Sequence, residues 1–111
     1  RLYDKLLEDV PEIKTPIEKE WAYHSYCRYI IQAERRDELF RFLTKKGIEV
    51  FVHYFTPLHL QPFLADCDGY KEGMYPITEK TAKKVLTLPS WPYQSAQDVD
   101  YTVESVKEFY K

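Results

Sequence analysis

Two histidines and a tyrosine lie close together in one short stretch of this sequence, as His53, Tyr54 and His59 within residues 47–63. An imidazole and a phenol at the end of a strand can donate hydrogen bonds to phosphate or sugar hydroxyl groups. Because the stretch also contains two prolines and several aromatic residues, it is typical of a loop that presents functional groups from a rigid strand. The alternative, which the bare spacing favours, is that His53 only ends its strand in a satisfied hydrogen bond.

A metal site is not expected from the same residues. His53, His59 and Cys67 match no zinc-binding spacing, and zinc needs three or four convergent ligands. Cys27 and Cys67 form no joint motif, and in a chain without a signal-peptide pattern we expect both to be reduced thiols. The sequence also lacks a glycine-rich phosphate loop and a nucleophile elbow, so no catalytic residue is assigned.

Length and composition indicate one small globular domain, residues 1–111. Hydrophobic residues make up 44% and charged residues 31% of the chain, which argues against disorder. The net charge of −2 comes from interspersed acids and bases with no basic block, so nucleic acid is not an expected partner. No apolar run approaches the roughly 18 residues that span a bilayer, so no membrane partner is expected, and cytoplasm is the default location.

The elements that must position this stretch begin with a helix. Apolar residues at helical spacing from Leu2 predict a helix that ends near Asp9, ahead of Pro11. Since the chain starts with Arg1 and no capping residue precedes the repeat, we expect a piece of a longer protein. Residues 21–33 alternate between an apolar and a mixed face, which predicts a strand.

The next predicted elements lead directly into the histidine-containing stretch. A charged run at residues 34–37 is typical of a solvated turn, and Asp37 suits the start of a helix that Gly47 ends. Residues 48–53 alternate as a second strand, with Ile48, Val50 and Val52 on one face. Residues 54–63 are predicted to be a loop, and residues 64–75 an irregular connection.

The last third of the chain predicts two more helices around a short strand. Pro76 suits the first turn of a helix, whose buried face would comprise Ile77, Thr81, Ala82 and Val85. Residues 86–88 predict an edge strand, and a final helix is capped by Ser95 with Asp98 three positions on. The order predicts an α+β fold, with a small antiparallel or mixed sheet and helices packed on one side.

The motif His53-Tyr54-x-x-Pro57-Leu58-His59-x-Gln61-Pro62 resembles one in DegT/StrS-type pyridoxal-phosphate aminotransferases, which aminate keto groups on nucleotide-linked sugars. The resemblance is to the C-terminal small domain of these fold-type I enzymes, and it covers nearly the whole chain in order. The further matching segments are Leu2-Tyr3-Asp4-x-Leu6-Leu7, Tyr23-His24-x-Tyr26, Arg36-Asp37-x-Leu39, Gly47-Ile48, Pro76-x-x-Glu79 and Leu86-x-Leu88-Pro89. A departure is Ser90-Trp91-Pro92, where the family more often has an aliphatic residue after Leu-Pro.

The resemblance implies that this chain is one domain of an enzyme whose cofactor is bound by another domain. The lysine that binds the cofactor, and most cofactor contacts, belong to a large N-terminal domain that is absent here, and no lysine of this chain matches that motif. It therefore implies substrate-binding roles for His53 and Tyr54, and a less direct one for His59, with no catalytic, cofactor-binding or metal residue on this chain. The complete enzyme is expected to be a homodimer that uses pyridoxal phosphate and a nucleotide-sugar substrate.

Two functional hypotheses remain open at this point. The chain is either the substrate-contacting domain of an aminotransferase, inactive alone, or a stand-alone or relic binding module without catalytic activity. An in-frame large domain upstream of Arg1, with its lysine, would support the first hypothesis. The sugar, the position that is aminated and the amino donor are not specified by the sequence.

Overall fold

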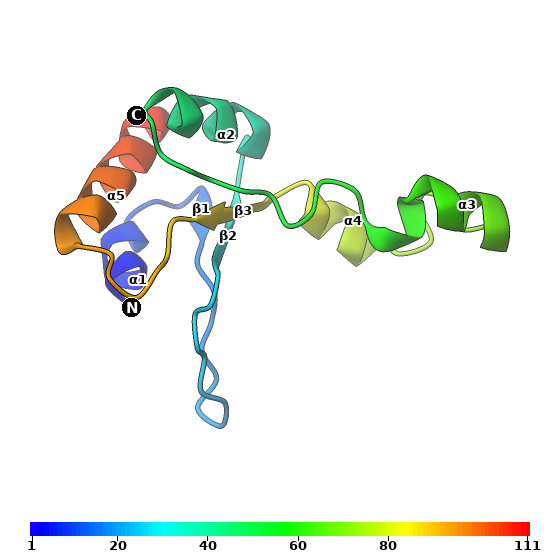
Figure 1. The fold of residues 1–111 in the computed structure, drawn as a ribbon, viewed down its shortest axis with the longest axis horizontal. Helices are drawn as coiled ribbons and strands as arrows, with labels where there is room; N and C mark the ends of the chain where they lie inside the picture. The colour runs from blue at the N-terminus through cyan, green and yellow to red at the C-terminus, as the bar shows by residue number, and fades with distance from the viewer.

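A three-stranded antiparallel sheet in the order β1-β2-β3 lies at the centre of the molecule (Figure 1). The computed structural model describes residues 1–111, apart from the side chains of residues 65, 67 and 68, so the expectation about Cys67 lies outside the described residues. The elements are α1 (Leu2–Leu7), β1 (Ile13–Lys14), β2 (Tyr29–Ala33), α2 (Arg36–Lys45), the 3-10 helix η1 (Leu58–Leu60), α3 (Pro62–Asp68), α4 (Pro76–Ala82), β3 (Val85–Leu88) and α5 (Ala96–Tyr110).

Helices α1, α2 and α5 cover one side of the sheet and enclose the core with it (Figure 1). Burying one large aliphatic side chain stabilises a fold by roughly 1.5–3 kcal/mol, so the fully buried aliphatic side chains of this core supply most of the driving force for folding. These features confirm the predicted α+β fold with an antiparallel sheet. The fully buried aliphatic side chains are Leu7, Ile31, Leu39, Leu43, Leu86, Leu88 and Val106.

Residues 54–82 form an arm that carries η1, α3 and α4 away from the core (Figure 1). The arm makes the molecule long, with extents of 48 × 37 × 26 Å and a radius of gyration of 15.7 Å. A compact domain of this length would have a radius of gyration of roughly 13 Å. Among the described residues, no helix has the length and apolar character needed to cross a membrane.

The strand predicted over residues 21–33 is correct only for its last five residues, Tyr29–Ala33. Trp21 and Tyr23 are each 85% exposed, and Tyr26 has a positive φ of 51°, which is not extended backbone. Local hydrogen bonds take the place of ladder bonds: the Glu18 carboxylate accepts from the His24 N–H at 3.0 Å, and the His24 ring accepts from the Tyr26 N–H at 2.9 Å. Such side-chain bonds compete with strand pairing.

The second predicted strand, residues 48–53, has the expected alternation but hardly any ladder. Ile48 and Val50 are buried and Phe51 is exposed. Only the Phe51–Thr87 pair forms a bridge, with the Phe51 N–H donating at 3.1 Å and its carbonyl accepting at 2.7 Å. The segment therefore meets β3 at one residue pair and then turns into the arm.

Helix α4 begins at Pro76 as predicted, but of its predicted buried face only Ala82 is buried. Ile77 is 82% exposed, while Ala82 at the other end is buried. The reason is that α4 belongs to the arm, so only its last turn reaches the core. Residues predicted to be irregular also form α3, which Pro62 starts at its first turn.

The cap of α5 gives a test of the local structure. The Ser95 hydroxyl accepts from the Asp98 N–H at 3.1 Å, and the Asp98 carboxylate accepts from the Ser95 N–H at 3.2 Å. We expect Ser95→Ala to lower the free energy of unfolding by about 1 kcal/mol, and Ser95→Gly by a few tenths. Thermal unfolding measures this, with Ser25→Ala in an exposed loop as the control; equal melting of Ser95→Ala and wild type would contradict the cap.

Candidate functional site

A hollow of about 360 Å³ lies where the arm leaves the core. One wall is the loop that starts at His53, and the other is formed by α4 and the first residue of β3. We call this hollow the cleft. Its lining residues are His53, Tyr54, Thr56, Pro57, Leu58, Ile77, Thr78, Thr81, Ala82 and Val85.

His53 is held in the cleft by β3. Its Nδ1 lies 2.8 Å from the hydroxyl oxygen of Thr87, a buried residue, and the Phe51–Thr87 bridge fixes the backbone two residues earlier. When the Thr87 hydroxyl donates to Nδ1, Nε2 carries the ring proton and can donate to a phosphate or sugar oxygen. Among the described residues, Nε2 has no hydrogen-bond partner. His53 can therefore bond Thr87 through Nδ1 and bind a ligand through Nε2 at the same time.

Tyr54 adds the phenol that the sequence places beside His53. Its side chain is 67% exposed, and its ring meets the His53 ring edge-on at a centroid distance of 5.3 Å. The two polar groups thus line one wall of the cleft together. An exposed hydroxyl next to an imidazole can form hydrogen bonds to a polar ligand without first breaking an internal one.

His59 lies away from the cleft, inside the arm. It is 7% exposed, and its Nε2 donates to the Glu79 carboxylate at 2.8 Å. The same carboxylate accepts from the Gly73 N–H at 2.9 Å and from the Tyr75 N–H at 3.4 Å. Glu79 therefore holds η1, the loop before α4 and α4 together. The sequence pattern did not assign this role to Glu79, although Glu79 stands in the matching segment Pro76-x-x-Glu79.

The hydrogen bonds that the Glu79 carboxylate accepts predict a specific pH dependence of stability. The His59 hydrogen bond, followed by the Gly73 N–H, holds the pKa of Glu79 below its ordinary value of 4.5. Because the folded pKa is the lower one, the stabilisation is present above about pH 4.5 and is lost as the pH falls through the folded pKa. Urea unfolding between pH 3 and 7 should show wild type losing stability more steeply below this pH than Glu79→Gln.

Glu72→Gln changes an exposed glutamate of the same arm and is the matched control. Its stability curve should run parallel to that of wild type. Parallel curves for wild type and Glu79→Gln would show that the folded protein does not lower the pKa of Glu79.

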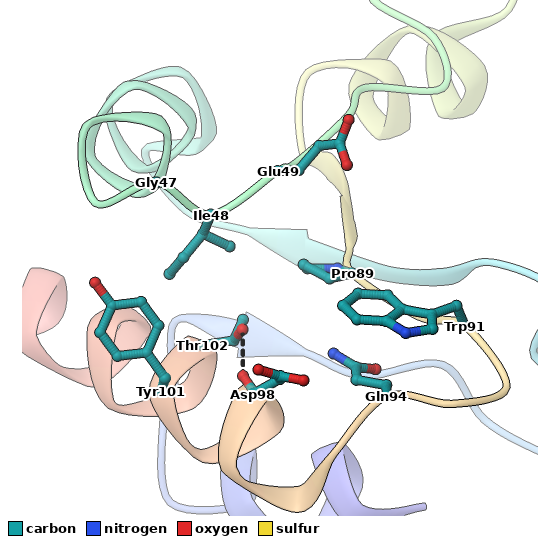
Figure 2. A pocket seen from close by; sticks show the side chains of 9 residues that line it. All are labelled: Gly47, Ile48, Glu49, Pro89, Trp91, Gln94, Asp98, Tyr101 and Thr102. Atoms are coloured by element: carbon teal, nitrogen blue, oxygen red, sulfur yellow. Dashed lines mark hydrogen bonds between the residues drawn. The ribbon is translucent and has the colours of Figure 1, made fainter.

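A second hollow, of about 190 Å³, lies between residues 47–49, the loop after β3 and the start of α5 (Figure 2). Four of its six polar side chains, those of Gln94, Asp98, Tyr101 and Thr102, are already bonded within the protein. The Tyr101 hydroxyl donates to the Lys46 carbonyl at 2.9 Å, Gln94 donates to the Tyr3 hydroxyl at 3.2 Å, and Asp98 caps its helix. The cleft is therefore the better candidate site.

The described residues contain no group of three or more His, Cys, Asp or Glu side chains that could hold a metal ion. Of the three residues first considered as ligands, the structure places His53 in the cleft and His59 in the arm, while the side chain of Cys67 is not among those described. His53 and His59 thus act in separate environments.

The matching family model is that of the DegT/DnrJ/EryC1/StrS aminotransferases, and it covers residues 1–107. This α+β domain with its cleft therefore belongs to the DegT/DnrJ/EryC1/StrS aminotransferase family. The structural comparison agrees. A crystal structure of Streptomyces venezuelae DesV in complex with a ketimine intermediate matches 98% of this chain with a TM-score of 0.92 at 30% identity. An aminotransferase of the family from Brucella abortus matches 96% of it, with a TM-score of 0.84 at 30% identity.

Curated relatives give the same picture over a limited part of their length. A pleiotropic regulatory protein of Geobacillus stearothermophilus is 44% identical over 98% of this chain and 30% of its own length. The dTDP-3-amino-3,4,6-trideoxy-alpha-D-glucose transaminase of Streptomyces venezuelae is 31% identical over 93% of this chain and 27% of its own length. This chain thus spans about 30% of the relatives that it matches.

Proposed function

We propose that this chain is the C-terminal small domain of a pyridoxal-phosphate-dependent sugar aminotransferase and contributes substrate-binding residues to it. The observation that carries the proposal is the cleft, in which the Nε2 of His53 and the hydroxyl of Tyr54 are open to a ligand. The dTDP-sugar transaminase among the relatives supports a nucleotide-linked keto sugar as the substrate class. In this role His53 and Tyr54 donate hydrogen bonds to its phosphate or sugar oxygens.

The cofactor is supplied by the rest of the enzyme. A Streptococcus pneumoniae protein described as a sugar aminotransferase has a structure in its PLP form, with a TM-score of 0.86 at 27% identity. The described residues that line the cleft include no lysine, so they do not by themselves fit a covalently held pyridoxal phosphate. We assign the chemistry of amino-group transfer to the bound cofactor, and binding and orientation of the substrate to this chain.

Exposed apolar side chains support a larger assembly. Large apolar side chains are exposed on the arm, beside the cleft, and on the loop before β2, and exposed apolar surface is typical of regions that another protein part covers. We assign that part to the remaining two-thirds or so of a complete enzyme, with a homodimer as its assembly. The residues concerned are Trp21, Tyr23, Phe55, Leu58, Phe63 and Ile77.

His59 has an indirect role in this proposal. Its Nε2 is already bonded to Glu79, and its ring packs edge-on against Tyr75 at 4.8 Å. We assign it to holding the arm in the shape that places Leu58 at the cleft. Direct contact between His59 and the substrate stays a prediction.

The test is His53→Ala in the full-length enzyme, assayed with dTDP- and UDP-linked keto sugars, an amino donor and pyridoxal phosphate. Losing a hydrogen bond to a charged group costs about 1.5–3 kcal/mol, which is roughly a ten- to hundred-fold loss in kcat/KM. The cofactor spectrum should be unchanged, because the cofactor is held elsewhere. A lower melting temperature with unchanged kcat/KM would show that His53 serves only the strand end.

Two further variants separate the roles of the ring nitrogens. His53→Gln keeps a hydrogen-bonding side chain and should retain more activity than His53→Ala. Thr87→Val removes the partner of Nδ1 at nearly constant volume and should reduce kcat/KM less than His53→Ala, since the imidazole remains. His24→Gln, a histidine outside the cleft, is the matched control.

The 111-residue chain alone should not retain pyridoxal phosphate. No lysine lines the described part of the cleft, and covalent capture of the cofactor needs a positioned, activated amine. Incubation with the cofactor, desalting and a visible spectrum measure retention. A stoichiometric absorbance band that disappears when one lysine is replaced would contradict this division of the enzyme.

A further inference from the structure

Arg36 is a charged residue in a buried position. Its side chain is 5% exposed, although it stands in a charged run that predicts a solvated turn. Burying a cation is costly unless its donors are satisfied. Here Nη1 donates to the Ala82 carbonyl at 2.9 Å and to the Val85 carbonyl at 2.8 Å, and Nε donates to Asp37 at 2.7 Å.

The two residues that carry these carbonyls line the cleft. Ala82 is the last residue of α4, Val85 is the first residue of β3, and both line the hollow. One nitrogen of Arg36 therefore fixes both ends of the connection between α4 and β3. Because Arg36 begins α2, this wall is anchored to the core of the domain.

The guanidinium also contacts the segment that forms the other wall. Its central carbon lies 5.0 Å from the centroid of the Phe55 ring, a cation–π distance. The Phe55 ring in turn meets Phe40 of α2 edge-on at 6.1 Å. Phe55 directly follows Tyr54, so holding Phe55 restricts the backbone position from which the phenol of Tyr54 enters the cleft.

We propose that Arg36 is a positioning residue that sets the separation between the two walls of the cleft. Its polar edge holds the α4–β3 wall while its flat face holds Phe55, and both contacts depend on the planar guanidinium. A lysine keeps the charge but has no planar group with which to make both contacts at once. The effect on a nucleotide sugar rests on the proposed function, whereas the effect on the shape of the cleft does not.

The first test measures a change in the environment of Tyr54 in the cleft and needs no catalytic turnover. A fluorinated tyrosine is placed at Tyr54 of the full-length protein, and its fluorine resonance is compared between wild type, Arg36→Lys, Arg36→Met and Arg41→Lys. Arg41 is exposed and lies on the same helix, and its hydrogen-bond partner among the described residues is the Asp37 carbonyl of that helix, so it is the matched control. Arg36→Lys and Arg36→Met should shift or broaden the resonance, and Arg41→Lys should leave it in place.

The second test measures the KM and kcat for the substrate. Arg36→Lys should raise the KM for the keto sugar nucleotide about ten-fold with a smaller change in kcat, because a misplaced wall weakens binding more than chemistry at the cofactor. Phe55→Leu keeps the carbonyl bonds of Arg36 but removes the aromatic face, so it should give part of the same effect. Combined with Arg36→Lys, it should add less than its separate effect, since both act through one contact.

Wild-type resonance and wild-type KM in both Arg36 variants would overturn the proposal. So would variants that only lower the melting temperature or the yield, while the folded fraction keeps the wild-type resonance and KM. If the enzyme turns over no keto sugar nucleotide, the proposed function fails, and the fluorine resonance still decides the role of Arg36. A shift in Arg36→Lys but not in Arg41→Lys then supports the positioning role alone.

Discussion

The pairing of Thr87 on both of its edges is the constraint on which both the fold and the cleft depend. On one side β3 forms its ladder with β2, where Thr87 is opposite Ile30, and on the other side Thr87 bridges Phe51. Its hydroxyl bonds His53 as well. Since strands of this length are marginal alone, the ladder with β2 and the bridge to Phe51 both contribute to the stability of β3. The imidazole is thereby placed by the same backbone bonds that complete the sheet.

Polar groups hold the arm together and help to anchor it to the core. Glu79 gathers its own helix, η1 and the loop between them, and Arg36 fixes the end of α4 to α2. Hydrogen bonds are directional, so such anchors define a geometry more narrowly than apolar contacts of equal energy. The cleft lies between these anchors, and its shape follows from them.

The features that could be predicted from the sequence are those with a local physical cause. The end of α2 at Gly47, which has a positive φ of 77°, and the capping box at Ser95 each follow from a few neighbouring residues. The strand prediction was wrong over residues 21–28 because the side chains of Glu18 and His24 form hydrogen bonds to the backbone locally. Arg36 was missed because a charged run is normally solvated, and its carbonyl partners lie 46 and 49 residues away. No periodicity signals such a contact.

The packing of α1 against α5 has a consequence for folding during synthesis. Leu7 of α1 belongs to the same buried core as Val103 and Val106 of α5, nearly a hundred residues later, so this core is complete only when α5 is present. On the ribosome, the sheet and α2 are therefore made before the helix that closes their core, and that core stays open until α5 emerges. Contacts between segments so far apart slow folding and leave apolar surface accessible to chaperones in the interval.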